Sequence, residues 1–466
     1  MTPSKKISIQ PGSRLYFIGI GGVGMSALAK VLKLGGYPVS GSDRYPSART
    51  HELEGLGIPI KFGQQEIGFE PSDIIIYSSA IHPDHLEFQE ARRRQMTIHH
   101  RAEVLSFFFN RAKTAIGVTG THGKTTTTSM IAFMLSELGK NPTCLVGGEV
   151  LNFGTNARFG DPDLWIAEVD ESDQTHELYC PHYAVVTNLE EDHLDHYGNL
   201  EALKSSFINF VQNAADPGLI IHSADDPVMA ELMHSIKVPQ LTFGFEARAD
   251  YRATAVEEKD FGSEFDLEEA GFFVTRVKLS VPGRHNIANA LAALAVLSQL
   301  GLDPCEMAPF LANFRGARRR LEIKWKSQDL TVIDDYAHHP TEVSASLRAL
   351  RSHAGRLTAI FQPHRFSRTR HFYKDFGKVL EMADELIVTE VYGAGEKNPD
   401  RVSSSLIYDE LVAAGHPNAH IMDKNEIIAY LLNRSDLSGT VAFLGAGDIG
   451  EIADEFANRL KSLAAA

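Results

Sequence analysis

The sequence predicts an α/β protein of three domains: an N-terminal Rossmann-like domain, a central domain of the P-loop ATPase type with a mostly parallel sheet, and a C-terminal Rossmann-like domain. Short apolar runs alternate with helical spacings along the chain, which is typical of such sheets. Two glycine-rich turns, near residues 19–24 and 120–125, each join an apolar run to a helical one. The length of 466 residues fits about three domains of ~150 residues each.

We place the domains at residues 1–112, 113–318 and 319–466. Composition is that of a globular protein, with 43% hydrophobic and 23% charged residues. The net charge of −15 argues against binding to nucleic acid but allows a small anionic ligand. There is no apolar signal core and no apolar run near the ~20 residues that span a bilayer, so we expect a cytoplasmic protein. Three cysteines without paired spacing predict reduced, buried thiols.

The first domain opens with an apolar run, a glycine turn and helical spacing. Gly21, Gly22 and Gly24 would let a pyrophosphate approach the start of that helix, and Asp43 follows at the distance expected for a ribose contact. Three interpretations stay open here: an NAD(P) site, a site for another pyrophosphate compound such as a sugar nucleotide, and a structural turn. Ser78 and Ser79 follow a further strand, at the edge where such sheets bind ligands.

The central domain contains the stretch AIGVTGTHGKTTTTSMIAFM at residues 115–134, which predicts a strand, a phosphate loop and a helix. Glycines would bring backbone N–H groups to a triphosphate, Lys124 would add a charge on an exposed loop, and the Thr125 hydroxyl would bind Mg²⁺. The fit to G-x-x-x-x-G-K-[ST] is imperfect, because Val118 stands where the first glycine is expected.

Two further apolar strands in this domain run into acidic and histidine-containing clusters, at residues 168–173 and 190–196. They suit Mg²⁺ beside a phosphate loop, although solvated surface is the alternative for each residue. We expect the polar segment from 247 to 274 to be irregular. His285 and Asn289 begin an Ala/Leu-rich helix, where they could contact a base or cap the helix.

The C-terminal domain repeats the α/β pattern after a basic run at residues 318–320. Its predicted strands each end in polar segments, at residues 334–339, 362–370, 392–396 and 445–448, which indicates a ligand-binding edge. Arginines near His338 could clamp a carboxylate with two hydrogen bonds, and a solvated basic loop is the alternative.

Taken together, these segments resemble the Mur ligase family. The resemblance covers essentially the whole chain, through FIGIGGVGMSALA, SGSD, SSAI, GTHGKTTT, DESD, TNLEEDHLDHYG, DDYAHHPTEV, FQPHRFSRTR, VYGAGE and FLGAGDIG. It implies ATP-dependent amide-bond formation in peptidoglycan precursor synthesis, with Mg²⁺ as the metal and Mn²⁺ as a substitute. UDP-N-acetylmuramate and L-alanine are the implied substrates, which favours the sugar-nucleotide interpretation of the first glycine turn.

The resemblance also implies roles for individual residues. The sugar nucleotide would meet Gly21, Gly22, Gly24, Asp43, Ser78 and Ser79. ATP would meet Gly120, Thr121, His122, Gly123, Lys124, Thr125, Thr126, His285, Asn289, Arg319, Arg320 and Asp335. The metal would bind Thr125, Glu168 and His193, and alanine would bind Tyr336, His338, Arg365 and Arg368. The catalytic group would comprise Lys124, Glu168, His193, His338 and Arg368.

Other functions compete with this one. Within the family, a recycling ligase attaches a whole tripeptide to the same sugar nucleotide, but the segments QPHRFSRTR and EEDHLDHYG favour the alanine-adding type. An NAD(P)-dependent oxidoreductase built on the first glycine turn and a non-catalytic nucleotide-binding protein are the alternatives from other classes. Neither a monomer nor a homodimer is excluded.

Overall fold

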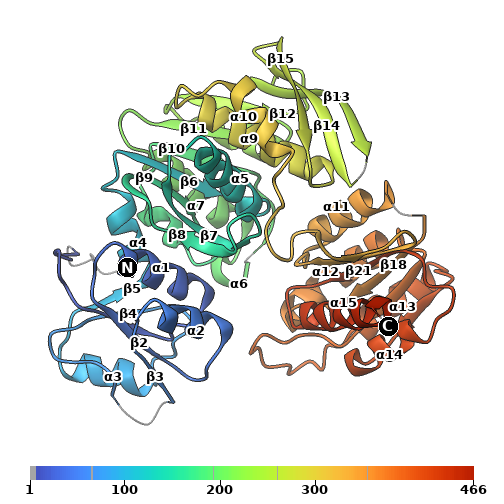
Figure 1. The fold of residues 1–466 in the computed structure, drawn as a ribbon, viewed down its shortest axis with the longest axis horizontal. Coiled ribbons are helices and arrows are strands. Elements are labelled where there is room, and N and C mark those ends of the chain that lie inside the picture. The colour runs from blue at the N-terminus through green and yellow to red at the C-terminus, as the bar shows by residue number, and fades with distance from the viewer. Residues whose placement is uncertain (1–6, 64–66, 193, 260, 354, 466) are drawn as a thin grey trace. The chain divides into compact units, whose positions relative to one another are not determined.

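The computed structural model describes residues 7–63, 67–192, 194–259, 261–353 and 355–465, and its helices and strands form three sheets (Figure 1). The chain divides into two compact units. The first comprises Met1–Thr254, Leu267–Thr275 and Ala288–Leu311, and the second comprises Ala255–Asp266, Arg276–Ile287 and Ala312–Ala466. Within the described residues, no helix is both long and apolar enough to cross a membrane.

The N-terminal sheet is parallel, with the strand order β3-β2-β1-β4-β5. The chain reverses its winding direction between β1 and β4, so a crevice is expected at the carboxyl ends of these two strands. The strands are β1 (Leu15–Ile18), β2 (Val39–Asp43), β3 (Ile60–Phe62), β4 (Ile74–Tyr77) and β5 (Ile98–His100). The helices are α1 (Val23–Leu34), α2 (Ala48–Gly55), α3 (Leu86–Arg93) and α4 (Arg101–Phe109).

The central sheet has ten strands in the order β15-β14-β13-β12-β11-β10-β6-β9-β7-β8 and is mixed, because β8 runs antiparallel to β7. Strands β9, β6, β10 and β11 are parallel neighbours, so their carboxyl ends meet at one edge. The strands before β13 are β6 (Thr114–Thr119), β7 (Pro142–Val150), β8 (Thr155–Arg158), β9 (Asp161–Glu168), β10 (Tyr183–Val186), β11 (Leu219–Ser223) and β12 (Gln240–Gly244). The helices are α5 (Lys124–Glu137), the 3-10 helix η1 (Thr175–Leu178), α6 (Leu194–Tyr197), α7 (Leu200–Gln212), α8 (Pro227–Met233), α9 (Arg284–Ser298) and α10 (Pro304–Leu311).

The expectation of an irregular segment from 247 to 274 is wrong, because this region forms β13 (Tyr251–Lys259), β14 (Gly262–Glu269) and the start of β15 (Phe272–Leu279). Its acidic residues obscured the alternation of buried and exposed side chains that is typical of strands: Tyr251 and Ala253 are buried, as are Phe265 and Leu267, while the residues between them are more exposed.

The expectation of buried, reduced cysteines is also partly wrong. Cys144 is buried but Cys305 is exposed, and all three cysteines are free.

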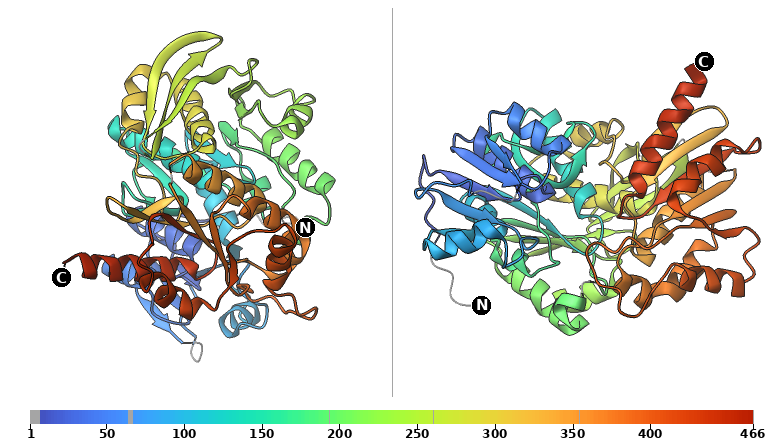
Figure 2. Two further views of the ribbon diagram at one scale, coloured as in Figure 1. Left: turned by 90° about the vertical axis from the view of Figure 1, so that its right-hand side faces the viewer. Right: turned by 90° about the horizontal axis from the view of Figure 1, so that it is seen from below.

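The C-terminal sheet has the order β16-β17-β21-β18-β19-β20 and is parallel except for the edge strand β16. Helix α15 packs against β16, β17 and β21 and then projects beyond them to the chain end (Figure 2). The strands are β16 (Glu322–Lys326), β17 (Leu330–Asp335), β18 (Leu357–Phe361), β19 (Glu385–Val388), β20 (Ala419–Ile421) and β21 (Gly439–Leu444). The helices are α11 (Pro340–Arg351), α12 (Phe366–Leu380), α13 (Ser405–Ala413), α14 (Lys424–Leu432) and α15 (Ile449–Ala465).

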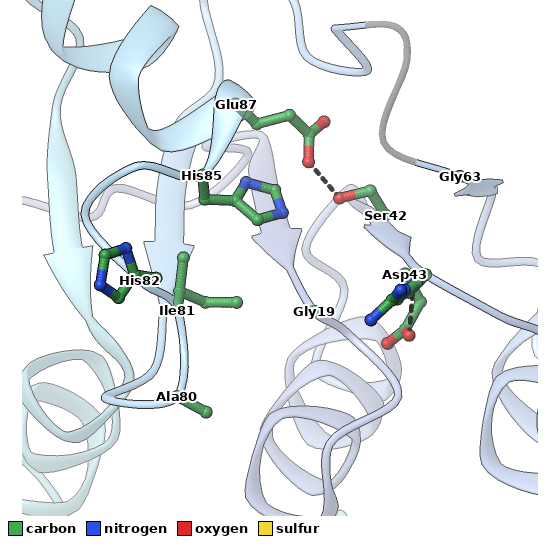
Figure 3. A pocket seen from close by; sticks show the side chains of 10 residues that line it. Gly19, Ser42, Asp43, Gly63, Ala80, Ile81, His82, His85 and Glu87 are labelled. Carbon is green, nitrogen blue, oxygen red and sulfur yellow. Dashed lines mark hydrogen bonds between the residues drawn. The ribbon is translucent and has the colours of Figure 1, made fainter. Parts of the chain in front are cut away.

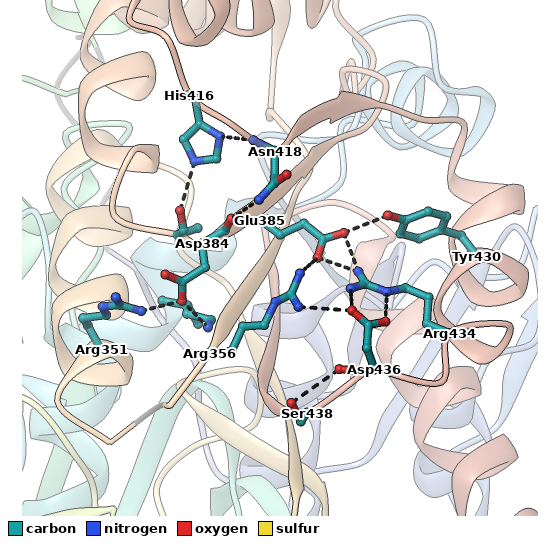
Figure 4. Close-up of polar contacts among 12 residues, drawn as sticks. Arg351, Arg356, Asp384, Glu385, His416, Asn418, Tyr430, Arg434, Asp436 and Ser438 are labelled. Atoms are coloured by element: carbon teal, nitrogen blue, oxygen red, sulfur yellow. Dashed lines mark hydrogen bonds and ion pairs between the residues drawn. The ribbon is translucent and has the colours of Figure 1, made fainter.

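A buried ion cluster closes the amino end of this sheet (Figure 4). Glu385, the first residue of β19, is 2% exposed and accepts hydrogen bonds from the Tyr430 hydroxyl at 2.8 Å and from Arg356 at 3.1 Å. Arg434 donates to the same carboxylate and also to Asp436. Burial raises the pKa of Glu385, but the donors from Arg434 and Tyr430 outweigh it and lower the pKa below its ordinary value.

We expect Glu385→Gln to lower the free energy of unfolding at neutral pH by about 2 kcal/mol, because Arg434 and Arg356 then keep only Asp436 as a carboxylate partner. A lowered folded-state pKa means that the contribution is complete above the ordinary glutamate pKa of ~4.3 and is lost as pH falls through the folded value. Urea unfolding of both proteins should therefore show a difference at neutral pH that shrinks in acid. The exposed Glu381→Gln should stay within ~0.5 kcal/mol of wild type throughout.

Candidate active site

The phosphate loop lies between β6 and α5, as the sequence predicts. Thr187 and Asn188, which follow the neighbouring strand β10, hold its backbone. The amide of Asn188 accepts from His122 N–H at 2.9 Å and donates to His122 O at 3.0 Å, while Thr121 N–H donates to Asn188 O at 3.1 Å. Sequence reasoning missed both residues, although their place directly after a predicted neighbouring strand was a usable signal.

Two glycines make this loop possible. A Cβ atom on Gly120 would lie 2.1 Å from Thr187 Oγ1, and one on Gly123 would lie 2.5 Å from Asn289 Oδ1. Gly123 also has φ +85°, the left-handed conformation that other residues rarely adopt, and it stands immediately before the first residue of α5. The backbone can therefore present its N–H groups and the helix start to an anion.

Lys124 is buried beside Glu171, not exposed as the sequence suggested. Its side chain is 14% exposed, and its Nζ donates to Gly120 O at 2.6 Å and to Glu171 Oε1 at 2.8 Å. Burial acts to lower the pKa of Lys124, but the negative charge of Glu171 outweighs it and raises that pKa. Lys124 is therefore held as a cation inside the loop.

Thr125 and Glu168 supply hard oxygen atoms of the kind that Mg²⁺ prefers. The Thr125 hydroxyl donates to Glu168 Oε1 at 3.1 Å, and Gly147 N–H donates to Glu168 Oε2 at 2.6 Å. Any Cβ on Gly147 would lie 2.4 Å from Glu168 Oε1, so the carboxylate is closely confined. These two residues fit the metal. His193, the third predicted ligand, lies outside the described residues.

The N-terminal sheet carries a cavity of about 280 Å³ at the predicted crevice, between the loop after β4 and the end of β2 (Figure 3). Asp43 lines it and accepts from Gly21 N–H at 2.7 Å, which leaves no room for a side chain on Gly21. Glu87, buried behind it, accepts from the Tyr16 hydroxyl at 2.6 Å and from Ser42. The lining residues are Gly19, Ser42, Asp43, Arg44, Gly63, Ala80, Ile81, His82, His85 and Glu87.

The other predicted sugar-nucleotide residues, Gly21, Gly22, Gly24, Ser78 and Ser79, are not among the residues that line this cavity. Gly22 precedes the first residue of α1, and the guanidinium of Arg101 lies about 3.0 Å from where a Cβ on Gly24 would stand. Ser78 and Ser79 directly precede the lining residues of the loop after β4. Sequence reasoning missed His82 and His85, because a histidine in a loop has no spacing that distinguishes it.

The C-terminal sheet gathers the predicted alanine-binding residues at its carboxyl edge. The rings of Tyr336 and His338 are 5.3 Å apart, and His364 lies 5.6 Å from His338. Arg368, only 9% exposed, places Nη1 3.3 Å from His364 Nδ1. Burial lowers the pKa of His364 to about 3, helped by the neighbouring His338 and Arg368, so this imidazole is neutral at pH 7. His364 is another residue that the sequence-based assignment omitted.

The three residues of this domain that were predicted to contact ATP each have partners within the domain. Arg319 donates to Gly447 O at 3.0 Å and to Gly445 O, and its guanidinium lies 5.1 Å from the Tyr336 ring centre. Arg320 stacks on the same ring at 5.3 Å. Asp335 is buried and accepts from the Ser346 hydroxyl, and burial raises its pKa to about 6.

The two residues predicted to contact the base have different surroundings. Asn289 is buried and accepts from the Thr127 hydroxyl at 3.2 Å, so it contacts the phosphate-loop helix. His285, at the start of α9, is half-buried and packs closely on Gly283.

Comparisons with known proteins point to the same family over nearly the whole chain. Sequence models described as the Mur ligase family catalytic domain, the Mur ligase middle domain and the Mur ligase glutamate ligase domain match residues 14–113, 118–297 and 319–447. A UDP-N-acetylmuramate–L-alanine ligase from Gloeobacter violaceus is 42% identical over 453 residues, covering 96% of this chain and 96% of the relative. The chain belongs to the Mur ligase family. A ligase of the same name from Geobacter sp. (strain M21) is 38% identical, covering 96% of this Mur ligase and 98% of the relative.

Solved structures agree. The crystal structure of a UDP-N-acetylmuramate-alanine ligase from Thermotoga maritima matches this Mur ligase with a TM-score of 0.81 and 32% identity, covering 96% and 99% of the two chains. A murein peptide ligase from Psychrobacter arcticus shares the fold, with a TM-score of 0.68, 24% identity and coverage of 96% and 99%. The predicted family and the three-domain α/β fold are confirmed.

Gly123→Ala should weaken ATP binding about tenfold or more, because the new Cβ meets Asn289 and the left-handed conformation costs ~1–2 kcal/mol. Gly139→Ala is the matched control, since Gly139 has φ +71° but open space around it. Its free energy of unfolding in urea should fall by the same conformational cost, and its ATP affinity should stay at the wild-type value. Equal ATP affinities for the two variants, measured by titration calorimetry, would contradict the steric argument.

Lys124→Ala should lower the free energy of unfolding by about 3 kcal/mol, because it leaves the Glu171 carboxylate buried without its cation. The double variant Lys124→Ala/Glu171→Ala should regain most of that stability while still binding ATP poorly. Lys140→Ala, on an exposed residue past the end of α5, should change neither property. Urea unfolding and ATP titration test this, and a double variant no more stable than the single one would refute the pairing.

Proposed function

We propose that this Mur ligase joins L-alanine to the lactyl carboxylate of UDP-N-acetylmuramate, converting ATP to ADP and phosphate, in peptidoglycan precursor synthesis in the cytoplasm. The observation that carries the proposal is full-length similarity, at 36–42% identity over about 96% of the chain, to ligases named for this reaction. The phosphate loop, the cavity beside Asp43 and the residues around Arg368 would be the sites for the three substrates.

The first step activates the carboxylate, which is a poor acyl donor at neutral pH. A lactyl carboxylate oxygen attacks the γ-phosphorus of ATP, the bond to the β-phosphate oxygen breaks, and an acyl phosphate and ADP result. Lys124 and the N–H groups of the glycine loop would stabilise the transferring phosphoryl group by charge and position. Thr125, Glu168 and His193 would hold Mg²⁺, which neutralises phosphate charge when bound.

The second step forms the amide. The alanine amine attacks the acyl carbon, and the tetrahedral intermediate expels phosphate. Arg365 and Arg368 would hold the alanine carboxylate, and the neutral His364 supports Arg368 without adding charge. His338 Nδ1 lies 2.9 Å from Tyr336 O, so a neutral ring carries its proton on Nδ1.

The remaining nucleotide contacts are part of the same proposal. Asn289 and His285 would meet the adenine side of ATP, and Arg319, Arg320 and Asp335 would reach ATP from the third domain.

The test of the proposal is phosphate release from MgATP with UDP-N-acetylmuramate and one acceptor at a time: L-alanine, L-serine, glycine or a murein tripeptide. We expect release that depends on L-alanine, together with an amide product of the corresponding mass. Release with the tripeptide alone would assign the recycling reaction instead. No release with any acceptor would refute a ligase activity.

Arg368→Ala should raise the KM for L-alanine about tenfold or more and leave the KM for ATP within about twofold, because it removes a charge-assisted hydrogen bond to the carboxylate. Arg370→Ala on the same helix is the control, since Arg370 is 63% exposed and pairs with Asp400. It should retain wild-type constants. An unchanged alanine KM in Arg368→Ala would remove this residue from the acceptor site.

A further inference from the structure

Three side chains from separate segments of the first unit form one continuous hydrogen-bond chain. His100 ends β5, Ser79 follows β4, and Asp173 follows β9 within the DESD segment. His100 Nε2 lies 3.1 Å from Ser79 Oγ, and Ser79 Oγ lies 2.9 Å from Asp173 Oδ2. The chain therefore connects the N-terminal sheet with the central sheet through a single hydroxyl group.

The contacts of His100 and Asp173 fix which groups donate and which accept in this series of hydrogen bonds. Ala102 N–H donates to His100 Nδ1 at 3.3 Å, so a neutral His100 ring carries its proton on Nε2 and donates it to Ser79. Burial lowers the pKa of His100, with Arg101 adding to the effect and Asp173 and Glu103 opposing it. The single hydroxyl proton of Ser79 is then directed to Asp173.

Asp173 is itself held in place. Its other oxygen, Oδ1, accepts from Thr175 N–H at 3.2 Å and from the Thr175 hydroxyl at 2.6 Å, at the start of the short helix η1. Ser79, by contrast, is exposed in a loop. The carboxylate is thus the anchor and the serine loop is the element that it positions.

Ser79 and Asp173 lie beside two different sites. Ser79 directly precedes Ala80 and Ile81, which line the cavity of the N-terminal sheet. Asp173 lies two residues after Glu171, the partner of Lys124, and five after Glu168, the partner of Thr125. One hydroxyl therefore joins the loop at the substrate cavity to the segment that carries the carboxylates of the phosphate site.

Other polar contacts join the two sheets elsewhere. Lys30 of α1 donates to the Thr155 hydroxyl of β8 at 2.6 Å, and Asn110 donates to Leu178 O at 2.9 Å while accepting from Cys180 N–H at 2.8 Å. Residues of both sheets also share one hydrophobic core. The sheets therefore stay together without Ser79, and its hydroxyl is free to serve local positioning of the loop.

We propose that Ser79 is a positioning residue. Its hydrogen bond to Asp173 holds the loop at the sugar-nucleotide cavity in a fixed position relative to the carboxylates of the phosphate site. The inference rests on the proposed ligase function, because phosphoryl transfer needs the lactyl carboxylate in line with the γ-phosphate. Loss of the bond should misplace the lactyl carboxylate of the sugar nucleotide and leave ATP binding intact.

The test compares Ser79→Ala, Asp173→Asn and the double variant by steady-state phosphate release. Each single variant should lower kcat/KM for UDP-N-acetylmuramate about tenfold and keep the dissociation constant of ATP within about twofold. The double variant should lose no more than the worse single variant, because both changes remove one bond. Ser79→Thr, which keeps a hydroxyl group, should retain most of the activity.

Two control variants separate this role from a general loss of structure. Ser205→Ala removes an exposed helix hydroxyl, and Asp303→Asn changes a carboxylate that accepts from a backbone N–H at a helix start. Both should behave as wild type. Wild-type activity in Ser79→Ala, or losses that multiply in the double variant, would overturn the proposal.

Amide hydrogen exchange tests the link apart from catalysis. Ser79→Ala and Asp173→Asn should each speed exchange in both segments, residues 78–82 and 170–176, because each change releases the same bond. Faster exchange confined to the mutated segment would overturn the proposal. A wild-type protein that releases no phosphate would refute the ligase function alone, since the exchange experiment would still decide whether the bond couples the two segments.

Discussion

The close approach of backbones around the phosphate loop is the constraint on which the central site depends. Gly120 lies so near Thr187 that no side chain fits between them, and Gly123 meets Asn289 in the same way. This packing works only because β9, β6 and β10 run parallel and in register, with Val118 beside Glu168 and Thr119 beside Val186. This register therefore places the phosphate loop, Glu168 and the residues that support the loop at one edge of the sheet.

In the C-terminal sheet, the two edges carry different groups of polar residues. Its carboxyl edge gathers Tyr336, His338 and Arg368, whereas its amino edge is closed by the ion cluster around Glu385. The two edges have different chemistry because of their partners. Charges at the amino edge satisfy one another, while the carboxyl edge carries the residues that we propose for binding L-alanine.

The sequence was a good guide to the fold and an incomplete one to the site. Strand and helix alternation and the glycine turns predicted three α/β domains, because these signals are local. The expectation for residues 247–274 failed, since acidic residues masked the alternation of β13 and β14. The pairing of Lys124 with Glu171 could not be foreseen, because only tertiary packing makes an acidic strand-end residue 1% exposed. His364 was missed for the same reason, whereas the position of Asn188 directly after a predicted strand was a usable signal.

The cavity of the N-terminal sheet has a consequence for inhibition. At about 280 Å³ it is small, and its walls combine Asp43 and Glu87 with His82 and His85. A fragment carrying hydrogen-bond donors and a flat ring would match those walls. Phosphate loops are shared by many unrelated ATP-binding proteins, so compounds aimed at Lys124 would meet competition from cellular ATP and from off-target sites. A compound seated beside Asp43 would not have to compete with cellular ATP.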